Sequence, residues 1–236
     1  LFYCFMPYLP LFYTHPCSII TIHDLGYFKY PEYLNKLKLI YFKYLISRAI
    51  KRSKYIVAIS EATKRDILSY FLLEKNNIKV VYEDSALTVP SDFLFKRPEV
   101  NLPYFLYVGE RRHHKNLENL IKAFSLFKKN DPFNTKLVLI GKDYKNYTAI
   151  LKNLIEELDL KSEVIILNPL SDEKLVSYYY YSLGLILVSF YEGFGLPLVE
   201  AMKIGTPIIT SNISAMPEIA GNAALFVNPN NVEDIA

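Results

Sequence analysis

The sequence predicts an α/β protein with two domains, each built on a parallel β-sheet. Short apolar runs typical of buried strands alternate with segments whose apolar residues have helical spacing. A proline-rich stretch at residues 84–103, which has neither period, interrupts this alternation. Seven of the eight glycines follow residue 100, and Gly109 and Gly141 end predicted strands. We therefore predict a first domain at residues 1–84, a linker at 85–101 and a second domain at 102–236.

The first domain is expected to hold three strands and two helices. The strands are predicted at Ser18–Ile22, Tyr55–Ile59 and Asn77–Tyr82, and the helices at Asn35–Ser53 and from Ser60 to Phe71. Ser60 is expected to cap its helix, because a serine oxygen can accept a hydrogen bond from an N–H of the first turn. The apolar opening, residues 1–22, contains three prolines, so we expect a poor membrane span, and it lacks the basic start of a signal peptide.

The second domain restarts the alternation with six strands. They are predicted at Tyr104–Val108, Lys136–Ile140, Glu163–Leu167, Leu183–Val188, Pro207–Ser211 and Ala223–Val227. The helices between them are predicted at Asn116–Asn130, Thr148–Leu158, Ser171–Tyr181 and Leu198–Ile204, with a short turn near Met216. Such an alternation gives right-handed crossovers and a sheet covered on both faces, and ligands bind beyond the carboxyl ends of its strands.

Composition narrows the class of protein. The chain is 51% hydrophobic and 22% charged, which is typical of a folded globular protein. Cys4 and Cys17 have no metal-ligand spacing, and two reduced thiols suit the cytoplasm. The four histidines are scattered and no Asp-x-Asp occurs, so we expect no metal and no cofactor beyond the substrates. The absence of a Gly-x-Gly-x-x-Gly after a strand disfavours a nicotinamide-dependent dehydrogenase.

The positive charge is concentrated in the first domain. Residues 1–100 carry 14 Lys and Arg against 9 Asp and Glu, a net charge of +5, whereas residues 101–236 carry 13 against 15, a net charge of −2. Much of the excess lies between Lys36 and Lys54 on a predicted helix. A basic helix rich in aromatic residues can rest on an anionic membrane surface, and a solvated helix face accounts for it equally well. We expect no nucleic acid as partner, because no recognition motif accompanies the charge.

The most informative motif spans residues 189–207, SFYEGFGLPLVEAMKIGTP. It places Glu192 and Glu200 eight positions apart around a glycine turn, just before a predicted helix. The N–H groups and the dipole of a helix start attract an anion. Gly193 and Gly195 let the backbone approach a ligand, and a carboxylate accepts hydrogen bonds from a vicinal diol. A nucleotide sugar offers both chemistries, with its diphosphate on the turn, its ribose on Glu200 and a sugar hydroxyl on Glu192. A surface turn with two solvated acids is the alternative.

The motif also carries a family resemblance. EGFGLPLVEAM followed by GTPIITSNISAMPEIAGNAALFVNP resembles the C-terminal domain of glycosyltransferase family 4, the group 1 glycosyl transferases. The resemblance implies the GT-B fold, two Rossmann-like domains facing a cleft, and a retaining reaction without a metal. It implies that the donor contacts Glu192, Gly193, Phe194, Gly195, Leu196 and Glu200. It also implies that the acceptor attacks from the side on which the diphosphate leaves. Because the sequence shows no obvious protein base, we expect the diphosphate itself to serve as base.

A basic loop follows the first strand of the second domain. Gly109-Glu110-Arg111-Arg112-His113-His114-Lys115 leads into the helix from Asn116, where cations can neutralise a departing diphosphate. The family has a lysine at the position of Lys115, which we expect to be catalytic. Its arginine directly after the glycine is replaced here by Glu110, so Arg111 or Arg112 is expected to substitute. A solvated basic turn is the alternative.

The resemblance adds one residue in the first domain. His23 ends a predicted strand where the family often has a histidine that faces the donor sugar. We expect His23 to hydrogen-bond a sugar hydroxyl or to steady charge at the reacting carbon, although a lone histidine is more often structural. Asp24, next to it, is expected to be a turn or capping residue.

These features together predict a retaining hexosyltransferase that uses a nucleotide-diphosphate sugar. Resemblance to enzymes of bacterial cell-surface polysaccharide and lipopolysaccharide synthesis suggests mannose, a glycan or lipid-linked acceptor and a cytoplasmic location at the inner face of the membrane. The family's opening strand and glycine-rich loop have no match here, so we expect a fragment with an incomplete first domain. A non-catalytic nucleotide-sugar-binding remnant or a partner subunit is the alternative.

Overall fold

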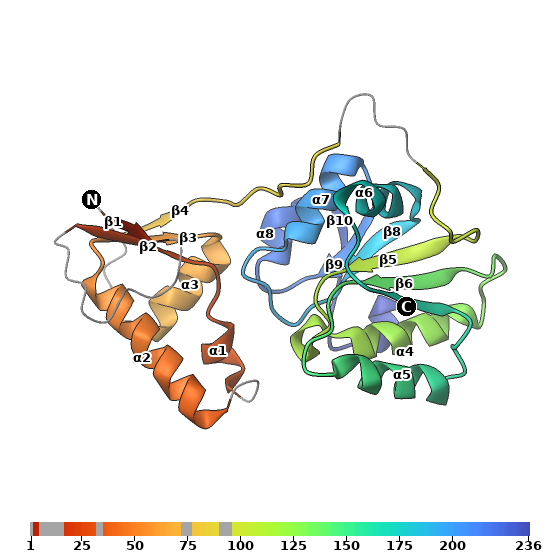
Figure 1. Ribbon diagram of the computed structural model, residues 1–236, viewed down its shortest axis with the longest axis horizontal. Coiled ribbons are helices and arrows are strands. Elements are labelled where there is room, and N and C mark those ends of the chain that lie inside the picture. Colours follow the sequence, from red (N-terminus) through yellow and green to blue (C-terminus); the bar gives the residue numbers. More distant parts are fainter. Residues whose placement is uncertain (1, 5–16, 32–34, 72–76, 90–95) are drawn as a thin grey trace. The chain divides into compact units, whose positions relative to one another are not determined.

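The computed structural model describes residues 2–4, 17–31, 35–71, 77–89 and 96–236 (Figure 1). The chain forms two compact units. The first comprises Leu1–Glu83 together with Glu192–Phe194, and the second comprises Asp84–Tyr191 and Gly195–Ala236. The beginning of the predicted linker therefore belongs to the second unit, where the Ser85 and Leu87 side chains are buried.

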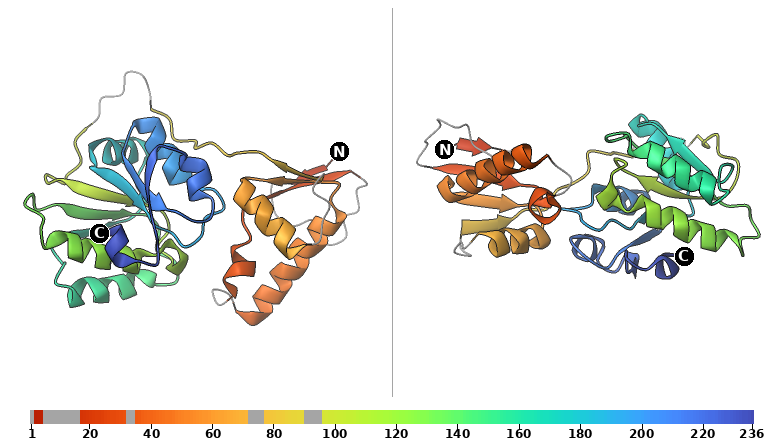
Figure 2. Two further views of the ribbon diagram at one scale, coloured as in Figure 1. Left: turned by 180° about the vertical axis from the view of Figure 1, so that it is seen from behind. Right: turned by 90° about the horizontal axis from the view of Figure 1, so that it is seen from below.

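The first unit is a parallel sheet with helices packed on it. Its strands are β1 (Phe2–Cys4), β2 (Ser18–Ile22), β3 (Tyr55–Ala58) and β4 (Ile78–Val80), and they lie in that order. Its helices are α1 (Gly26–Lys29), α2 (Lys36–Arg52) and α3 (Glu61–Tyr70). The two views of Figure 2 show α2 and α3 on the same face of the sheet. Between them lies a core that includes Ile20, Ile46, Ala49, Ile56 and Ile67.

Side-chain caps set where the two longer helices of this unit begin. The Asn35 side chain accepts a hydrogen bond from the N–H of Leu37 at 2.9 Å at the start of α2. The Ser60 Oγ accepts one from the N–H of Thr63 at 3.0 Å, which confirms the predicted cap of α3. Each cap satisfies an N–H that has no partner within its helix.

The second unit is a six-stranded sheet in which every pairing is parallel. Its strands are β5 (Tyr104–Val108), β6 (Lys136–Ile140), β7 (Val164–Leu167), β8 (Gly184–Leu187), β9 (Ile208–Ser211) and β10 (Ala224–Val227). They lie in the order β10-β9-β8-β5-β6-β7. Numbered from β5, this is the order 6-5-4-1-2-3 of a doubly wound sheet, which reverses direction between β5 and β8.

Helices cover both faces of this sheet. They are α4 (Leu117–Lys128), α5 (Tyr147–Glu157), α6 (Asp172–Tyr181), α7 (Leu196–Ile204), α8 (Met216–Ala220) and α9 (Val232–Ile235), with a 3₁₀ turn, η3, at His113–Lys115. Helices α4 and α5 pack together on one face, and α6, α7 and α8 lie on the other (Figures 1 and 2). Strand residues such as Leu106, Leu139 and Leu187 are fully buried between the layers.

Three of the differences between the predicted elements and the structure concern β1, α1 and the start of α7. Strand β1 and helix α1 have no counterpart in the prediction, because they are three and four residues long and show no period. Helix α7 begins at Leu196 and not at Leu198. Its start is set by Gly195, whose φ of 107° starts the helix without a side-chain penalty, so Pro197 lies inside the first turn. The predicted end at Gly205 is confirmed, with a φ of 82°.

Candidate functional site

Two loops meet at the point where the second sheet changes direction. Strands β5 and β8 are neighbours, with Leu106 opposite Leu185. The loop after β5 and the loop after β8 then join through a hydrogen bond from the N–H of Phe190 to the carbonyl of His114, at 2.8 Å. Ligands of doubly wound sheets bind at this position, beyond the carboxyl ends of the strands. The loop predicted to hold Lys115 therefore lies beside the segment that leads into the Glu192 motif.

Asn116 fixes the position of Lys115. It is buried and adopts the left-handed conformation, with φ 61° and ψ 33°, which asparagine and glycine tolerate best. Its Nδ2 donates to the carbonyl of Val188 at 2.9 Å and to that of Pro229 at 2.8 Å. The turn that ends in Lys115 is thus tied to the end of β8 and to the loop after β10.

Glycines permit the close approach of two strand ends. A Cβ at Gly141 would lie 1.9 Å from the carbonyl oxygen of Gly109, a distance that real atoms do not reach. Both glycines also have positive φ, 149° at Gly109 and 153° at Gly141. The loop after β5 and the loop after β6 can therefore be neighbours only while position 141 has no side chain.

The two arginines of the basic loop have different environments. The Arg111 guanidinium is buried and donates to the carbonyls of Gly141 at 2.5 Å and Leu167 at 3.0 Å, at the ends of β6 and β7. Its Nε donates to the Thr148 hydroxyl at 2.7 Å. Arg112 is partly exposed and its guanidinium lies 3.8 Å from the centre of the Tyr144 ring. Since Arg111 binds protein carbonyls, the cations with partly exposed side chains in this loop are Arg112 and Lys115.

One ionisable side chain near this loop, that of Asp143, has a shifted pKa. Hydrogen bonds from the hydroxyl and the N–H of Thr148 lower the pKa of Asp143, against the effect of burial. Asp143 therefore stays ionised and holds Thr148, which in turn accepts from Arg111. This chain of contacts keeps the arginine loop in place.

Glu200 lies on α7 with two hydroxyl groups directed at its carboxylate. The Ser85 Oγ donates to Oε1 at 3.1 Å, and the Tyr179 hydroxyl donates to Oε2 at 2.7 Å. Burial, together with the negative charge of Glu200, raises the pKa of Tyr179 well above its usual value. The phenol therefore remains a neutral donor at physiological pH. Lys203, one turn further along α7, binds the segment that carries Ser85, with its Nζ 2.6 Å from the Ser85 carbonyl and 2.8 Å from Asp84.

The turn of the predicted motif is divided between the two units. Glu192, Gly193 and Phe194 belong to the first unit, whereas Gly195, Leu196 and Glu200 belong to the second. The Gly193 carbonyl accepts hydrogen bonds from the Ser60 Oγ at 2.7 Å and the Thr63 Oγ1 at 3.2 Å. Phe194 is buried and its ring centre lies 6.1 Å from that of Tyr82.

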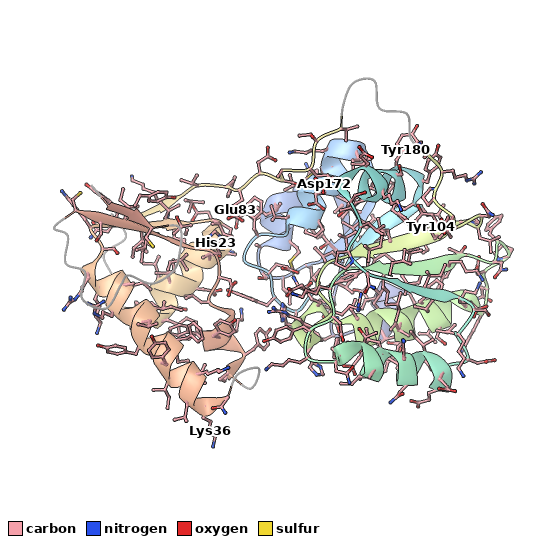
Figure 3. All side chains as sticks on the ribbon, in the orientation of Figure 1. His23, Lys36, Glu83, Tyr104, Asp172 and Tyr180 are labelled. Carbon is pink, nitrogen blue, oxygen red and sulfur yellow. The ribbon has the colours of Figure 1, made fainter. Side chains whose placement is uncertain are left out.

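His23 lies beside this turn within the first unit. A Cβ at Gly193 would be 2.0 Å from the His23 carbonyl oxygen, so only glycine fits there. The His23 Nδ1 is 2.8 Å from Glu83 Oε1, and the two side chains face one another in Figure 3. That contact favours the tautomer with its proton on Nδ1, in which Nε2 is the acceptor nitrogen. Asp24 Oδ1 accepts from the N–H of Gly26 at 2.7 Å and so makes a turn, as expected.

The structure thus gathers the predicted residues into two groups. Gly109, Lys115 and Arg112 lie in one loop at the switch point of the second sheet, while Glu200 lies on α7 of the same unit. His23 and Glu192–Phe194 lie in the first unit. Glu83, Ser85 and Tyr179 were not predicted as site residues. Of these three, only Tyr179 could have been suspected from the sequence, because it lies in a predicted amphipathic helix and a tyrosine hydroxyl needs a hydrogen-bond partner when it is buried.

The described residues contain neither a cluster of metal ligands nor a helix that could span a membrane. No group of three or more His, Cys, Asp or Glu side chains in those residues converges as a metal site requires. Within the same residues no helix is long and apolar enough to cross a bilayer.

A doubly wound sheet following a smaller parallel sheet in one chain defines the α/β architecture of GT-B glycosyltransferases, as predicted. Residues 92–236 match the family model described as glycosyl transferases group 1, and residues 2–83 match glycosyltransferase family 4. The chain therefore belongs to the group 1 glycosyl transferases of family 4.

Curated relatives agree with this assignment. The chain is 33% identical over 210 residues to the O-antigen chain mannosyltransferase RfbU of Salmonella typhimurium, covering 89% of this chain and 56% of that protein. It is 29% identical over 231 residues to O-antigen chain mannosyltransferase B of Escherichia coli, covering 93% and 59%. The chain thus spans a little more than half the length of these curated relatives.

Two solved structures share the fold at lower sequence identity. Sucrose-phosphate synthase from Thermosynechococcus elongatus has a TM-score of 0.74 at 21% identity, covering 92% of this chain and 56% of that one. Anabaena Alr3699/HepE in complex with UDP and glucose has a TM-score of 0.75 at 20% identity, covering 93% and 60%.

Proposed function

We propose that this chain carries the donor-binding domain of a retaining mannosyltransferase that builds a cell-surface polysaccharide. The observation that carries the proposal is the convergence of the Lys115 loop and the loop after β8 at the switch point of the second sheet. The names of the relatives, O-antigen mannosyltransferases, support mannose as the sugar. The complex of Alr3699/HepE with UDP and glucose supports a nucleotide-diphosphate sugar as donor.

Each part of the donor meets a group suited to it. The diphosphate is expected at the start of α7, where the N–H groups of the first turn and the helix dipole attract an anion. Lys115 and Arg112 supply positive charge to the leaving group. Glu200 accepts hydrogen bonds from the ribose diol, and Glu192 and His23 contact the sugar. The acceptor, a glycan or a lipid-linked sugar, is assigned to the first unit.

In the proposed mechanism, the protein acts mainly by stabilising the negative charge that develops on the departing diphosphate. The acceptor hydroxyl attacks the anomeric carbon on the face from which the diphosphate departs, and a diphosphate oxygen takes the hydroxyl proton. The bond from the anomeric carbon to the phosphate oxygen breaks, and the new negative charge falls on the nucleoside diphosphate. Positive side chains that are already in place stabilise this charge more than water does. We expect no metal ion to take part.

Calorimetry with GDP-mannose, UDP-glucose and a dTDP-sugar tests this proposal. We expect one donor to bind with a dissociation constant of about 1 µM–1 mM, as is usual for enzyme substrates. Chelation of divalent ions with EDTA is expected to leave that affinity unchanged. Failure of all three donors to bind would contradict the proposal. Binding without transfer or hydrolysis of the donor would instead support a non-catalytic nucleotide-sugar-binding protein.

Helix α2 supports a location at the inner face of the membrane. Its side chains Leu37, Ile40, Tyr41 and Tyr44 are 79%, 66%, 52% and 56% exposed, and their spacing puts them on one side of the helix. Arg48, Lys51 and Arg52 continue the same side one and two turns later. The helix has six basic residues and no acidic one, and Lys36 projects from its first turn (Figure 3). Apolar and basic side chains on one face are suited to an anionic lipid surface.

Vesicle sedimentation tests this surface. We expect the protein to bind vesicles containing phosphatidylglycerol and to bind pure phosphatidylcholine vesicles weakly, because each nearby cation contributes about 1 kcal/mol on an anionic membrane. The double variant Ile40→Asp/Tyr44→Asp is expected to lower binding at least about tenfold by removing buried apolar area and adding repulsion.

A matched control is Ile150→Asp, which changes an exposed apolar residue on helix α5 of the second unit. It should leave vesicle binding unchanged. Equal binding of the double variant and the unmodified protein would show that α2 is only a solvated helix face.

A further inference from the structure

We infer that Ser85 and Tyr179 are positioning residues that orient the Glu200 carboxylate for the donor ribose, which makes donor binding depend on the segment Asp84–Leu87. The inference rests on the proposed function, because it presupposes that Glu200 binds a nucleoside. It adds two residues from other parts of the sequence, 115 and 21 positions away from Glu200.

The number of lone pairs explains why this arrangement suits a diol. An ionised carboxylate has about four acceptor positions, two on each oxygen. Ser85 Oγ occupies one on Oε1, and the Tyr179 hydroxyl occupies one on Oε2. One position then remains on each oxygen, and a ribose has two adjacent hydroxyl donors. Because Ser85 and Tyr179 each donate to one oxygen, they also fix the plane of the carboxylate. The Glu200 side chain therefore loses less conformational freedom when the ribose binds.

Both donors are themselves held in place. The Ser85 Oγ accepts a hydrogen bond from the N–H of Leu87 at 3.0 Å, which leaves its proton for Glu200. Leu87 is buried in the core of the second unit and anchors this segment. Tyr179 is fully buried in helix α6, and its single O–H has Glu200 as acceptor. Their orientation therefore follows from packing and does not depend on a ligand.

Lys203 ties the segment to the same helix that carries Glu200. Its Nζ donates to the carbonyl of Ser85 at 2.6 Å and pairs with Asp84 at 2.8 Å. Glu200 and Lys203 are three positions apart on α7 and so lie on one side of it. The hydrogen bond from Lys203 lowers the pKa of Asp84, so the pair remains charged at neutral pH. Residues 84–87 directly follow the first unit in the chain, and Ser85 connects them to the carboxylate of Glu200.

The test compares a ribonucleotide with its dideoxy counterpart, using the full chain and calorimetry. The probes are GDP and 2′,3′-dideoxy-GDP, or the UDP pair if the donor screen selects uridine. The unmodified protein is expected to prefer the ribonucleotide by about 10–100-fold, as hydrogen bonds to a charged group imply. Tyr179→Phe and Ser85→Ala are each expected to weaken ribonucleotide binding about five- to tenfold and to change dideoxynucleotide binding less than about twofold. Ser85→Thr, which keeps the hydroxyl, should restore the preference.

Matched controls remove the same groups elsewhere. Tyr180→Phe removes a neighbouring hydroxyl from the exposed side of α6, where Figure 3 labels it. Ser162→Ala removes a serine that donates to another glutamate, Glu163, at 2.9 Å. Both are expected to keep the preference for ribose.

The possible failures are distinguishable. A parallel loss of affinity for both nucleotides, or no loss for either, would overturn the positioning role and leave the proposed function intact. If Tyr179→Phe does not fold, the Ser85→Ala and Ser85→Thr pair gives the same comparison. Absence of nucleotide binding in the unmodified protein would overturn the proposed function itself, and this inference with it.

Discussion

Replacing Gly141 by alanine is expected to lower the free energy of unfolding of the second unit by about 3–5 kcal/mol, from overpacking and backbone strain together. The new Cβ would lie 1.9 Å from the Gly109 carbonyl oxygen and 2.6 Å from its carbon. Both atoms belong to the backbone of Gly109, directly after β5, which is paired with β6, so neither can rotate away. The φ of 153° adds strain for any residue with a side chain.

Urea unfolding followed by circular dichroism measures this effect, and Gly205→Ala is its control. Gly205 has a φ of 82° but no atom within 4 Å of a Cβ built on it. In Gly205→Ala the free energy of unfolding is expected to fall by only about 1–2 kcal/mol, the cost of placing an alanine in the left-handed conformation. Equal losses in the two variants would show that strand ends β5 and β6 can separate, and that contact between them does not fix the basic loop. In the expected case Gly141→Ala also weakens donor binding, because the displaced loop carries Lys115.

The fold could be predicted where local chemistry decides the structure. Strands β5 and β6 have the predicted bounds, because each is a short apolar run with clear ends. The cap at Ser60 and the helix end at Gly205 also agree, since each depends on one residue and its nearest turn. Strand β1 was missed because three residues in a proline-rich apolar segment carry no period, and it forms by pairing with β2.

The candidate site was harder to predict because its contacts are distant in sequence. Arg111 lies in a run of basic residues that is typical of a solvated turn, but its guanidinium satisfies carbonyls 30 and 56 positions later. That role depends on the order of β5, β6 and β7, which the strand pattern does not give. The contact between Ser85 and Glu200 likewise requires a segment before β5 to pack against α7. The sequence motif predicts which residues contact the donor, whereas the groups that orient these residues emerge only from the tertiary structure.

The two halves of the Glu192–Glu200 motif have different structural settings. Gly193 is held by Ser60, whereas Glu200 is held by Ser85 and Tyr179. In each case a hydroxyl fixes a group that is predicted to face the donor. A motif that looks continuous in sequence is therefore positioned by hydrogen bonds within two separate units.

Replacing Lys115 by alanine is expected to lower the rate of sugar transfer about 10²–10³-fold. Lys115 ends the η3 turn, which Asn116 fixes by two hydrogen bonds to the carbonyls of Val188 and Pro229. The backbone of the lysine is thus placed before the donor arrives, so its charge is expected to stabilise the departing diphosphate with little reorganisation. Ground-state binding should weaken less, by about 1–3 kcal/mol, because the charge on the diphosphate grows as the sugar leaves.

Steady-state transfer assays with the donor selected by calorimetry separate these two effects. Lys115→Ala should reduce kcat strongly, and Lys115→Arg should retain part of it, since arginine keeps the charge but not the geometry. The matched control is Lys122→Ala, which removes an exposed lysine from α4, the helix that follows the η3 turn. It should leave both kcat and donor affinity unchanged, which excludes an effect of net charge alone. If Lys115→Ala kept full kcat while Arg112→Ala lost it, the charge on the leaving diphosphate would be assigned to Arg112 instead.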